Sequence, residues 1–222
     1  MKGTPYFFDR TDAGRQLAER LAAYAGGPEV RVLALPRGGV PVAYEVAVRL
    51  AVPLDVFLVR KLGVPGQEEL ALGAIATGGV RVLNRSVLRS MNIRPDQIEQ
   101  IAAHEQRELH RRELAYRSGR PPVQITGKTI LLIDDGLATG ATMRAAVEAV
   151  RKSAPAKVVV AVPVGAADVC RDFRRLADAV VCLVTPEPFY GVGMWYKQFG
   201  QTTDEEVRAL LKQAEAGSEN TF

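Results

Sequence analysis

The chain has 222 residues, 47% hydrophobic and 24% charged, which fits a single globular α/β domain with a sizeable core. Its 29 basic and 25 acidic residues give a net charge of +4, which permits an anionic ligand without requiring one. No apolar run approaches the length of a membrane-spanning helix, and the N-terminus lacks the apolar stretch of a secretion signal. Cys170 and Cys182 have no CxxC spacing, so we expect a cytoplasmic protein with reduced thiols.

Short runs rich in β-branched residues alternate with helical patterns, which predicts a parallel sheet built from β-α-β units. We expect the first strand at 30–35 and the second at 54–59, with a helix between them that has Pro41 in its first turn. The apolar residues of that helix recur at the spacing of one buried face: Ala43, Val46, Ala47 and Leu50.

Three more strands are expected at 130–133, 158–164 and 180–184. One helix follows the first of these strands, and another lies between the other two. The predicted buried residues are Met143, Ala146, Val147 and Val150 on the first helix, and Val169, Phe173 and Leu176 on the second.

Two stretches interrupt this alternation. Residues 71–83 are typical of a β-hairpin that turns at Gly78-Gly79, and residues 95–118 are typical of one long charged helix. That helix carries a thin apolar stripe of residues seven apart: Ala102, Leu109 and Tyr116.

The two ends of the chain are predicted to form a small hood over the edge of the sheet. Residues 11–24 have the pattern of an amphipathic helix, and residues 186–214 combine an aromatic loop with a final helix. We therefore expect a single domain over 1–222, with a core at about 28–185, a hood from 1–27 and 186–214, and disorder over 215–222.

Polar sequences end three of the predicted strands: Arg37-Gly38-Gly39, Arg60-Lys61 and Asp134-Asp135. The carboxyl ends of parallel strands meet at one edge of a sheet, and open α/β sheets bind ligands at that edge. Two adjacent carboxylates at the rim of a core repel each other and resist desolvation unless a metal, a hydroxylated ligand or solvent compensates them.

The loop 136–142 suggests what the two acids face. Its two glycines permit a tight turn, and the helix that follows points its N–H groups at the loop, so that with two threonine hydroxyls it forms an anion site. A phosphate on this loop and a diol on Asp134 and Asp135 together describe a ribose 5-phosphate. A P-loop is excluded because GxxxxGK[ST] does not occur, and the alternative for the two acids is a solvated strand end.

The segment IDDGLATGAT (133–142) resembles the phosphoribosyl-diphosphate (PRPP) loop of the type I phosphoribosyltransferase family. ALPRGG (34–39) is similar to the family's pyrophosphate loop, and RKLGVPGQEE (60–69) stands where the family has a mobile catalytic loop. The resemblance covers about 28–185. It implies a type I phosphoribosyltransferase-like parallel sheet flanked by helices, with a long inserted helix and a small hood.

The resemblance also implies roles for individual residues. Asp134 and Asp135 would hold the ribose hydroxyls, Arg37, Gly38 and Gly39 would contact the pyrophosphate, and Lys61 with Arg60 would close over it. The PRPP-binding loop would be Gly136, Leu137, Ala138, Thr139, Gly140, Ala141 and Thr142.

The implied reaction transfers the 5-phosphoribosyl group from PRPP to a small nitrogenous acceptor and releases pyrophosphate. Positive charge develops on the sugar as the anion departs, so the site should stabilise both, with the loop 60–69 excluding water. Mg²⁺ would travel mainly on PRPP, so we expect no metal site made by the protein alone. A homodimer is common in the family, whereas a membrane or nucleic-acid partner is not expected.

The acceptor and the general base stay open. Ala138 is similar to adenine-using members of the family, whereas 185–196 is similar to the base-binding segment of oxopurine enzymes, except that Trp195 replaces an expected acid. Phe189, Trp195 and Tyr196 are candidate stacking residues for a flat acceptor, with hood packing as the alternative. Glu68 and Glu69 are acid–base candidates, with a solvated charge pair as the alternative.

Two other functions remain. A regulator could sense PRPP and bind nucleic acid or a partner without catalysis, through a basic run on the long helix that is interleaved with acids. The chain could also work beside a partner enzyme. The basic run comprises Arg107, Arg111, Arg112, Arg117 and Arg120.

Overall fold

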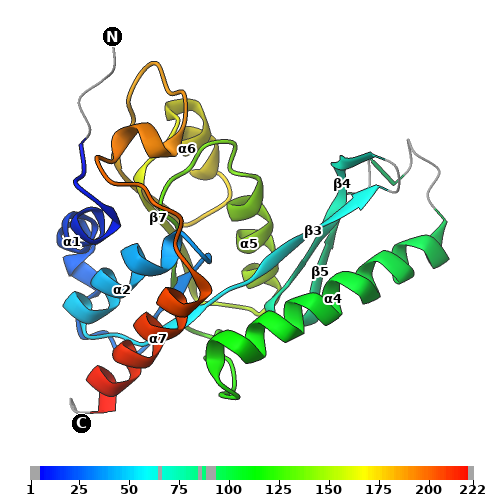
Figure 1. The fold of residues 1–222 in the computed structure, drawn as a ribbon, viewed down its shortest axis with the longest axis horizontal. Coiled ribbons are helices and arrows are strands. Elements are labelled where there is room, and N and C mark those ends of the chain that lie inside the picture. Colours follow the sequence, from blue (N-terminus) through cyan, green and yellow to red (C-terminus); the bar gives the residue numbers. More distant parts are fainter. Residues whose placement is uncertain (1–5, 65–66, 85–86, 89–93, 220–222) are drawn as a thin grey trace.

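The computed structural model describes residues 6–64, 67–84, 87–88 and 94–219, without the side chains at 64, 67–71 and 218–219. A five-stranded parallel sheet in the order β2-β1-β6-β7-β8 carries helices on both faces (Figure 1). The predicted α/β class is therefore confirmed. The strands are β1 (Val30–Ala34), β2 (Leu54–Val56), β6 (Thr129–Ile133), β7 (Lys157–Val164) and β8 (Ala179–Val184).

Helices cover both faces of this sheet, so both faces are buried. Successive side chains of a strand point to opposite sides, and a strand can therefore contribute to two cores. In β6, Leu131 and Ile133 enter the core on one face, and Ile130 and Leu132 enter the core on the other. This two-sided burial explains why the strands read as unbroken aliphatic runs.

Helices α1 (Arg10–Arg20), α2 (Gly39–Leu50) and α7 (Asp204–Glu219) contribute to the first core, and α5 (Ala141–Lys152) and α6 (Ala167–Phe173) to the second. The apolar stripes predicted for α2 and α5 are fully buried, which confirms their helical spacing. Helix α6 is shorter than expected, since it ends at Phe173 and Leu176 lies in the turn beyond it.

A second, antiparallel sheet and a long helix form an arm that extends away from the parallel sheet (Figure 1). Its predicted turn at Gly78-Gly79 is confirmed, with φ of 79° and 73° that favour glycine. The stripe of Ala102, Leu109 and Tyr116 is buried, as predicted. We call these elements the arm: β3 (Val59–Val64), β4 (Gln67–Ala76), β5 (Val80–Leu83) and α4 (Pro95–Arg117).

The loop conformation expected at 60–69 is wrong, because these residues belong to β3 and β4, apart from 65–66, which lie outside the described residues. Leu62 and Leu72 are fully buried in the cluster that includes the α4 stripe, and this packing stabilises strands where Gly and Pro had suggested a loop. The second predicted strand, 54–59, is shorter in the structure, because β2 ends at Val56 and Val59 already belongs to β3.

The ends of the chain pack differently from the expectation. Helix α7 runs to Glu219, so the predicted disorder is wrong for 215–219, and 220–222 lie outside the described residues. Helix α7 packs against α2 and α4 within the helical layer. We therefore call only 6–8 and 192–199 the hood, where the Phe7 amide donates to the Trp195 carbonyl at 3.0 Å and the Lys197 amide to the Phe7 carbonyl at 2.9 Å.

Candidate active site

The loop after β1 and the two acids after β6 are in contact at the carboxyl edge of the sheet. A Cβ on Gly38 would lie 2.1 Å from Asp135 Oδ2, and one on Gly39 would lie 2.9 Å from Asp134 Cα. Only glycine permits so close an approach of the two loops. The peptide bond between Pro36 and Arg37 is cis. The predicted convergence of these two strand ends is therefore confirmed.

The two carboxylates share a desolvated position. Desolvation, followed by the charge of Asp135, raises the pKa of Asp134 well above its ordinary value. Desolvation also raises the pKa of Asp135, and the charge of Arg10 opposes that rise. The amide of Asp135 donates to Asp134 Oδ1 at 2.9 Å, which fixes the first carboxyl. These two acids are partly buried and desolvated, so they are not a solvated strand end.

Two side chains hold Asp135 in ways that the sequence did not reveal. Arg10 Nε and Nη2 lie 2.9 and 2.8 Å from Asp135 Oδ2, and the Tyr196 hydroxyl donates to the Asp135 carbonyl at 2.6 Å. Arg10 is 125 residues from Asp135, and it lies at the start of an ordinary amphipathic helix. No local pattern marks such a long-range pair.

The loop 136–142 is held by main-chain hydrogen bonds at Leu137, and four of its other residues are exposed. The Leu137 amide donates to Val164 O at 2.8 Å, and the Leu137 carbonyl accepts from the Ala166 amide at 2.9 Å. Its side chain is buried, so Leu137 is an anchor rather than the ligand contact that we expected. Gly140 has φ of 72° and begins α5. The exposed residues of the loop are Ala138, Thr139, Ala141 and Thr142.

Arg60 and Lys61 had been expected at the end of a strand of the parallel sheet. Both lie instead within β3 of the antiparallel sheet. Neighbouring residues of a strand face opposite sides. Arg60 forms an ion pair with Glu105 of α4, away from the two acids. Lys61 lines a groove together with Thr139 and Ala141. The structure thus places Lys61, and not Arg60, beside the loop 136–142.

Arg37 is held from a different direction. Its guanidinium lies 3.6 Å from Asp204 at the start of α7, and Asp204 also accepts a hydrogen bond of 2.7 Å from the Tyr116 hydroxyl. Burial and this hydrogen bond raise the pKa of Tyr116 to about 12. The final helix and the arm are therefore both linked to the loop that carries Arg37.

The aromatic candidates separate into two groups. Trp195 and Tyr196 are 8% and 4% exposed and pack against Phe7, so their burial favours a packing role over the stacking role that we expected. Phe189 lines a hollow together with Ala138 and other exposed loop residues. The side chains of Glu68 and Glu69 lie outside the described residues.

The basic run on α4 is largely neutralised. Arg111 and Arg112 pair with Glu108 at 2.8 and 2.9 Å, and Arg120 pairs with Glu215 at 3.0 Å. Arg117 is not available at the surface of this run, because its side chain is only 6% exposed and pairs with the buried Asp55.

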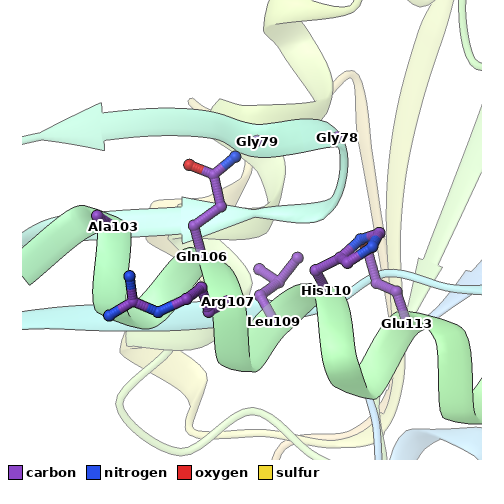
Figure 2. Close-up of a pocket in the computed structure, with 8 residues that line it drawn as sticks. All are labelled: Gly78, Gly79, Ala103, Gln106, Arg107, Leu109, His110 and Glu113. Atoms are coloured by element: carbon purple, nitrogen blue, oxygen red, sulfur yellow. The ribbon is translucent and has the colours of Figure 1, made fainter.

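A hollow lies between α4 and the Gly78-Gly79 turn (Figure 2). Gln106 reaches toward Gly79, and His110 and Glu113 lie side by side, 4.0 Å apart (Figure 2). Arg107 also lines this hollow. The charges at this surface are mixed, and the surface is separate from the edge that holds the two acids.

Comparisons with known proteins agree with this geometry. The model of the phosphoribosyl transferase domain family matches residues 9–193. A Mycobacterium tuberculosis protein, provisionally named a phosphoribosyl transferase in two strains, is 51% identical over 208 residues, 94% of this chain and 47% of that protein. The chain therefore spans about half the length of these curated relatives.

Two further relatives are matched over most of their own length. Bifunctional protein PyrR of Chloroflexus aurantiacus is 32% identical over 149 residues, which is 61% of this chain and 72% of that protein. A Thermus thermophilus protein of known crystal structure is 45% identical with a TM-score of 0.83, covering 93% of this chain and 98% of that chain. Among the described residues, no helix is long and apolar enough to cross a membrane.

Proposed function

Since the chain belongs to the phosphoribosyl transferase domain family, we propose that it transfers the 5-phosphoribosyl group from PRPP to a nitrogenous acceptor and releases pyrophosphate. One observation carries the proposal. Two desolvated carboxylates, a glycine loop in contact with them and an exposed loop that opens a helix all lie at one edge of the sheet. This edge can receive a sugar and its phosphates together.

We propose a contact with one part of PRPP for each segment. Asp134 and Asp135 accept hydrogen bonds from the ribose hydroxyls. The exposed residues of the loop 138–142 and the first amides of α5, which have no acceptor within the helix, bind the 5-phosphate. The backbone of Gly38 and Gly39 reaches the pyrophosphate, because these glycines bring the chain directly against the two acids.

The chemistry follows from the charges at this edge. The bond between the anomeric carbon and the pyrophosphate oxygen breaks, and the acceptor nitrogen forms the new bond to that carbon. The proton of that nitrogen leaves to the released pyrophosphate or to solvent. The carboxylates support the cationic sugar, while Arg37 and Lys61 compensate charge on the departing pyrophosphate. We place Mg²⁺ on the phosphate oxygens of PRPP, which are ligands that this ion prefers and where it would neutralise charge.

We place the acceptor, a nucleobase or a similar heterocycle, in the hollow beside the loop 136–142. Phe189 and Tyr190 line this hollow and offer flat apolar surface, and Ala138 lies at its junction with the loop. The alternative of a nucleic-acid-binding regulator has less support, because acids pair with Arg111, Arg112 and Arg117 on α4 and with Arg120 beyond it.

Pyrophosphate release tests the proposal. The protein is incubated with Mg²⁺ and PRPP and, in turn, with nucleobases, small amines and pyridine carboxylates. Release that depends on one acceptor is the expected result. Asp134→Asn/Asp135→Asn should abolish it, because each hydrogen bond to a carboxylate contributes about 1.5–3 kcal/mol, so the two together amount to at least about a hundredfold.

Asp172→Asn is the matched control, because Asp172 is exposed on α6 and its loss should leave release unchanged. PRPP binding by calorimetry, with no release for any acceptor, would move the function to a PRPP sensor. If PRPP does not bind either, the assignment of the two acids to a sugar is wrong.

A further inference from the structure

Arg10 lies at the centre of contacts that the proposed reaction does not explain. Two of its nitrogens reach Asp135 Oδ2 at 2.9 and 2.8 Å, and Nη1 donates to the Gly200 carbonyl at 2.7 Å. Its guanidinium carbon lies 3.9 Å from the centre of the Phe199 ring. The Arg10 side chain therefore connects helix α1 to the end of β6 and to residues 199–200.

The burial of this pair is costly. The side chains of Arg10 and Asp135 are 13% and 16% exposed, and removing two charges from water costs several kcal/mol per ion before their attraction is counted. Arg15 on the same helix forms an ordinary surface pair with Glu45 at 3.2 Å, with its own side chain 55% exposed. An arginine of α1 can therefore pair at the surface, and the helix itself does not require a buried one.

We propose that Arg10 is a positioning residue of the sugar site, which holds the Asp135 carboxylate ionised and oriented so that Oδ1 accepts a ribose hydroxyl. This inference rests on the proposed function. Both contacts of Arg10 are to Oδ2, so the second oxygen of Asp135 is left for the substrate. The stacking on Phe199 and the bond to Gly200 hold the guanidinium in place during binding.

The groups around Asp135 give Arg10 its electrostatic role. Asp134 adds a second acid, the Tyr196 hydroxyl binds the Asp135 carbonyl, and Gly38 brings no charge. Arg37 is turned to Asp204. Arg10 is therefore the cation that the described residues place on this carboxylate. Without it, desolvation raises the pKa of Asp135 further, and a protonated carboxyl is a poorer acceptor for a hydroxyl.

Two measurements on three variants test this role. Binding of Mg²⁺-PRPP is followed by calorimetry from about pH 5 to about pH 9, a range that spans a raised carboxyl pKa. The titration of carboxyl carbons is followed by NMR in protein with labelled aspartate. The variants are Arg10→Met, Arg10→Lys and, as the matched control on the same helix, Arg15→Met.

For Arg10→Met we expect binding near neutral pH to weaken by about tenfold to a hundredfold, the equivalent of one hydrogen bond from the ribose to a charged acceptor. The acid limb of the binding profile and one aspartate titration should both move to higher pH. Arg10→Lys should restore part of the affinity and most of the titration, and Arg15→Met should match the wild type. If Arg10→Met does not fold, Arg10→Gln, which keeps a donor without the charge, takes its place.

A uniform loss of affinity at every pH, with the aspartate titration unchanged, would overturn the proposal and leave Arg10 a purely structural residue. Failure of the proposed function gives a different result. The wild type would then bind no PRPP. The titration of the aspartate still tests Arg10 in that case: a shift in Arg10→Met supports its role in keeping Asp135 ionised, and no shift overturns that role.

Discussion

The carboxyl of Asp134 reduces the stability of the fold in a pH-dependent way. Its folded pKa is raised well above the ordinary value of 3.8, chiefly by desolvation. Below that ordinary value the folded and the unfolded chain both hold the proton, and there is no cost. As the pH rises toward the folded pKa, the unfolded chain loses its proton first, so the free energy of unfolding falls, and the full cost remains above the folded pKa.

Asp134→Asn should therefore stabilise the protein at neutral pH, by about 0.5–2 kcal/mol, while it weakens PRPP binding. Thermal or urea unfolding across the acid range measures the effect. The difference from the wild type should be small near the ordinary aspartate pKa and should grow as the pH rises. An equal difference at every pH would contradict the desolvation of Asp134, and Asp172→Asn, at an exposed site, should show no such trend.

Arg117 presents the opposite case, a buried charge that is fully compensated. Its Nε lies 2.9 Å from Asp55 Oδ1, and its Nη2 donates to the Val56 carbonyl at 2.9 Å. Arg117→Ala leaves Asp55 buried without its cation and should lower the free energy of unfolding by about 3–5 kcal/mol. Arg111→Ala, which removes an exposed pair with Glu108, should change it little because solvent screens that pair. Urea unfolding compares the two variants.

At the scale of elements, the strands and the long helix of the arm pack together. Leu109 of α4 is 1% exposed and belongs to the cluster that contains Leu62 of β3 and Leu72 of β4. Leu109→Ala should cost about 2–5 kcal/mol, since it removes buried methyl groups and leaves a cavity. Leu114→Ala, at a position that is 51% exposed on the same helix, is the matched control. Similar losses in the two variants would show that α4 does not pack against this sheet.

The elements were predictable where one face of a helix or strand is buried. The stripe of Ala102, Leu109 and Tyr116 identified α4 because seven-residue spacing returns a side chain to nearly the same face. The same reasoning missed β3 and β4. Their strands contain Gly63 and border Pro65-Gly66, which locally favour a loop, and the buried leucines that stabilise them act through α4, which lies far along the chain.

At the scale of the molecule, the sequence predicted the edge of the sheet but not everything that surrounds it. Strand ends of a parallel sheet share one edge by topology, so Gly38 and Asp135 could be placed together from the order of elements alone. Arg10, Tyr196 and Asp204 reach the same place from the two ends of the chain. Contacts of this kind depend on tertiary packing, and no periodicity or motif encodes them.

The meeting of Arg10, Asp135 and Gly200 on one side chain has a consequence for biosynthesis. A ribosome releases the chain from its N-terminus, so Arg10 emerges long before Asp135, and Gly200 emerges later still. The guanidinium can make all of its contacts only after Gly200 has left the exit tunnel. A nascent chain that stalls after Asp135 has emerged but before Gly200 has both Arg10 and the two acids, but it lacks the Gly200 carbonyl that accepts a hydrogen bond from the guanidinium.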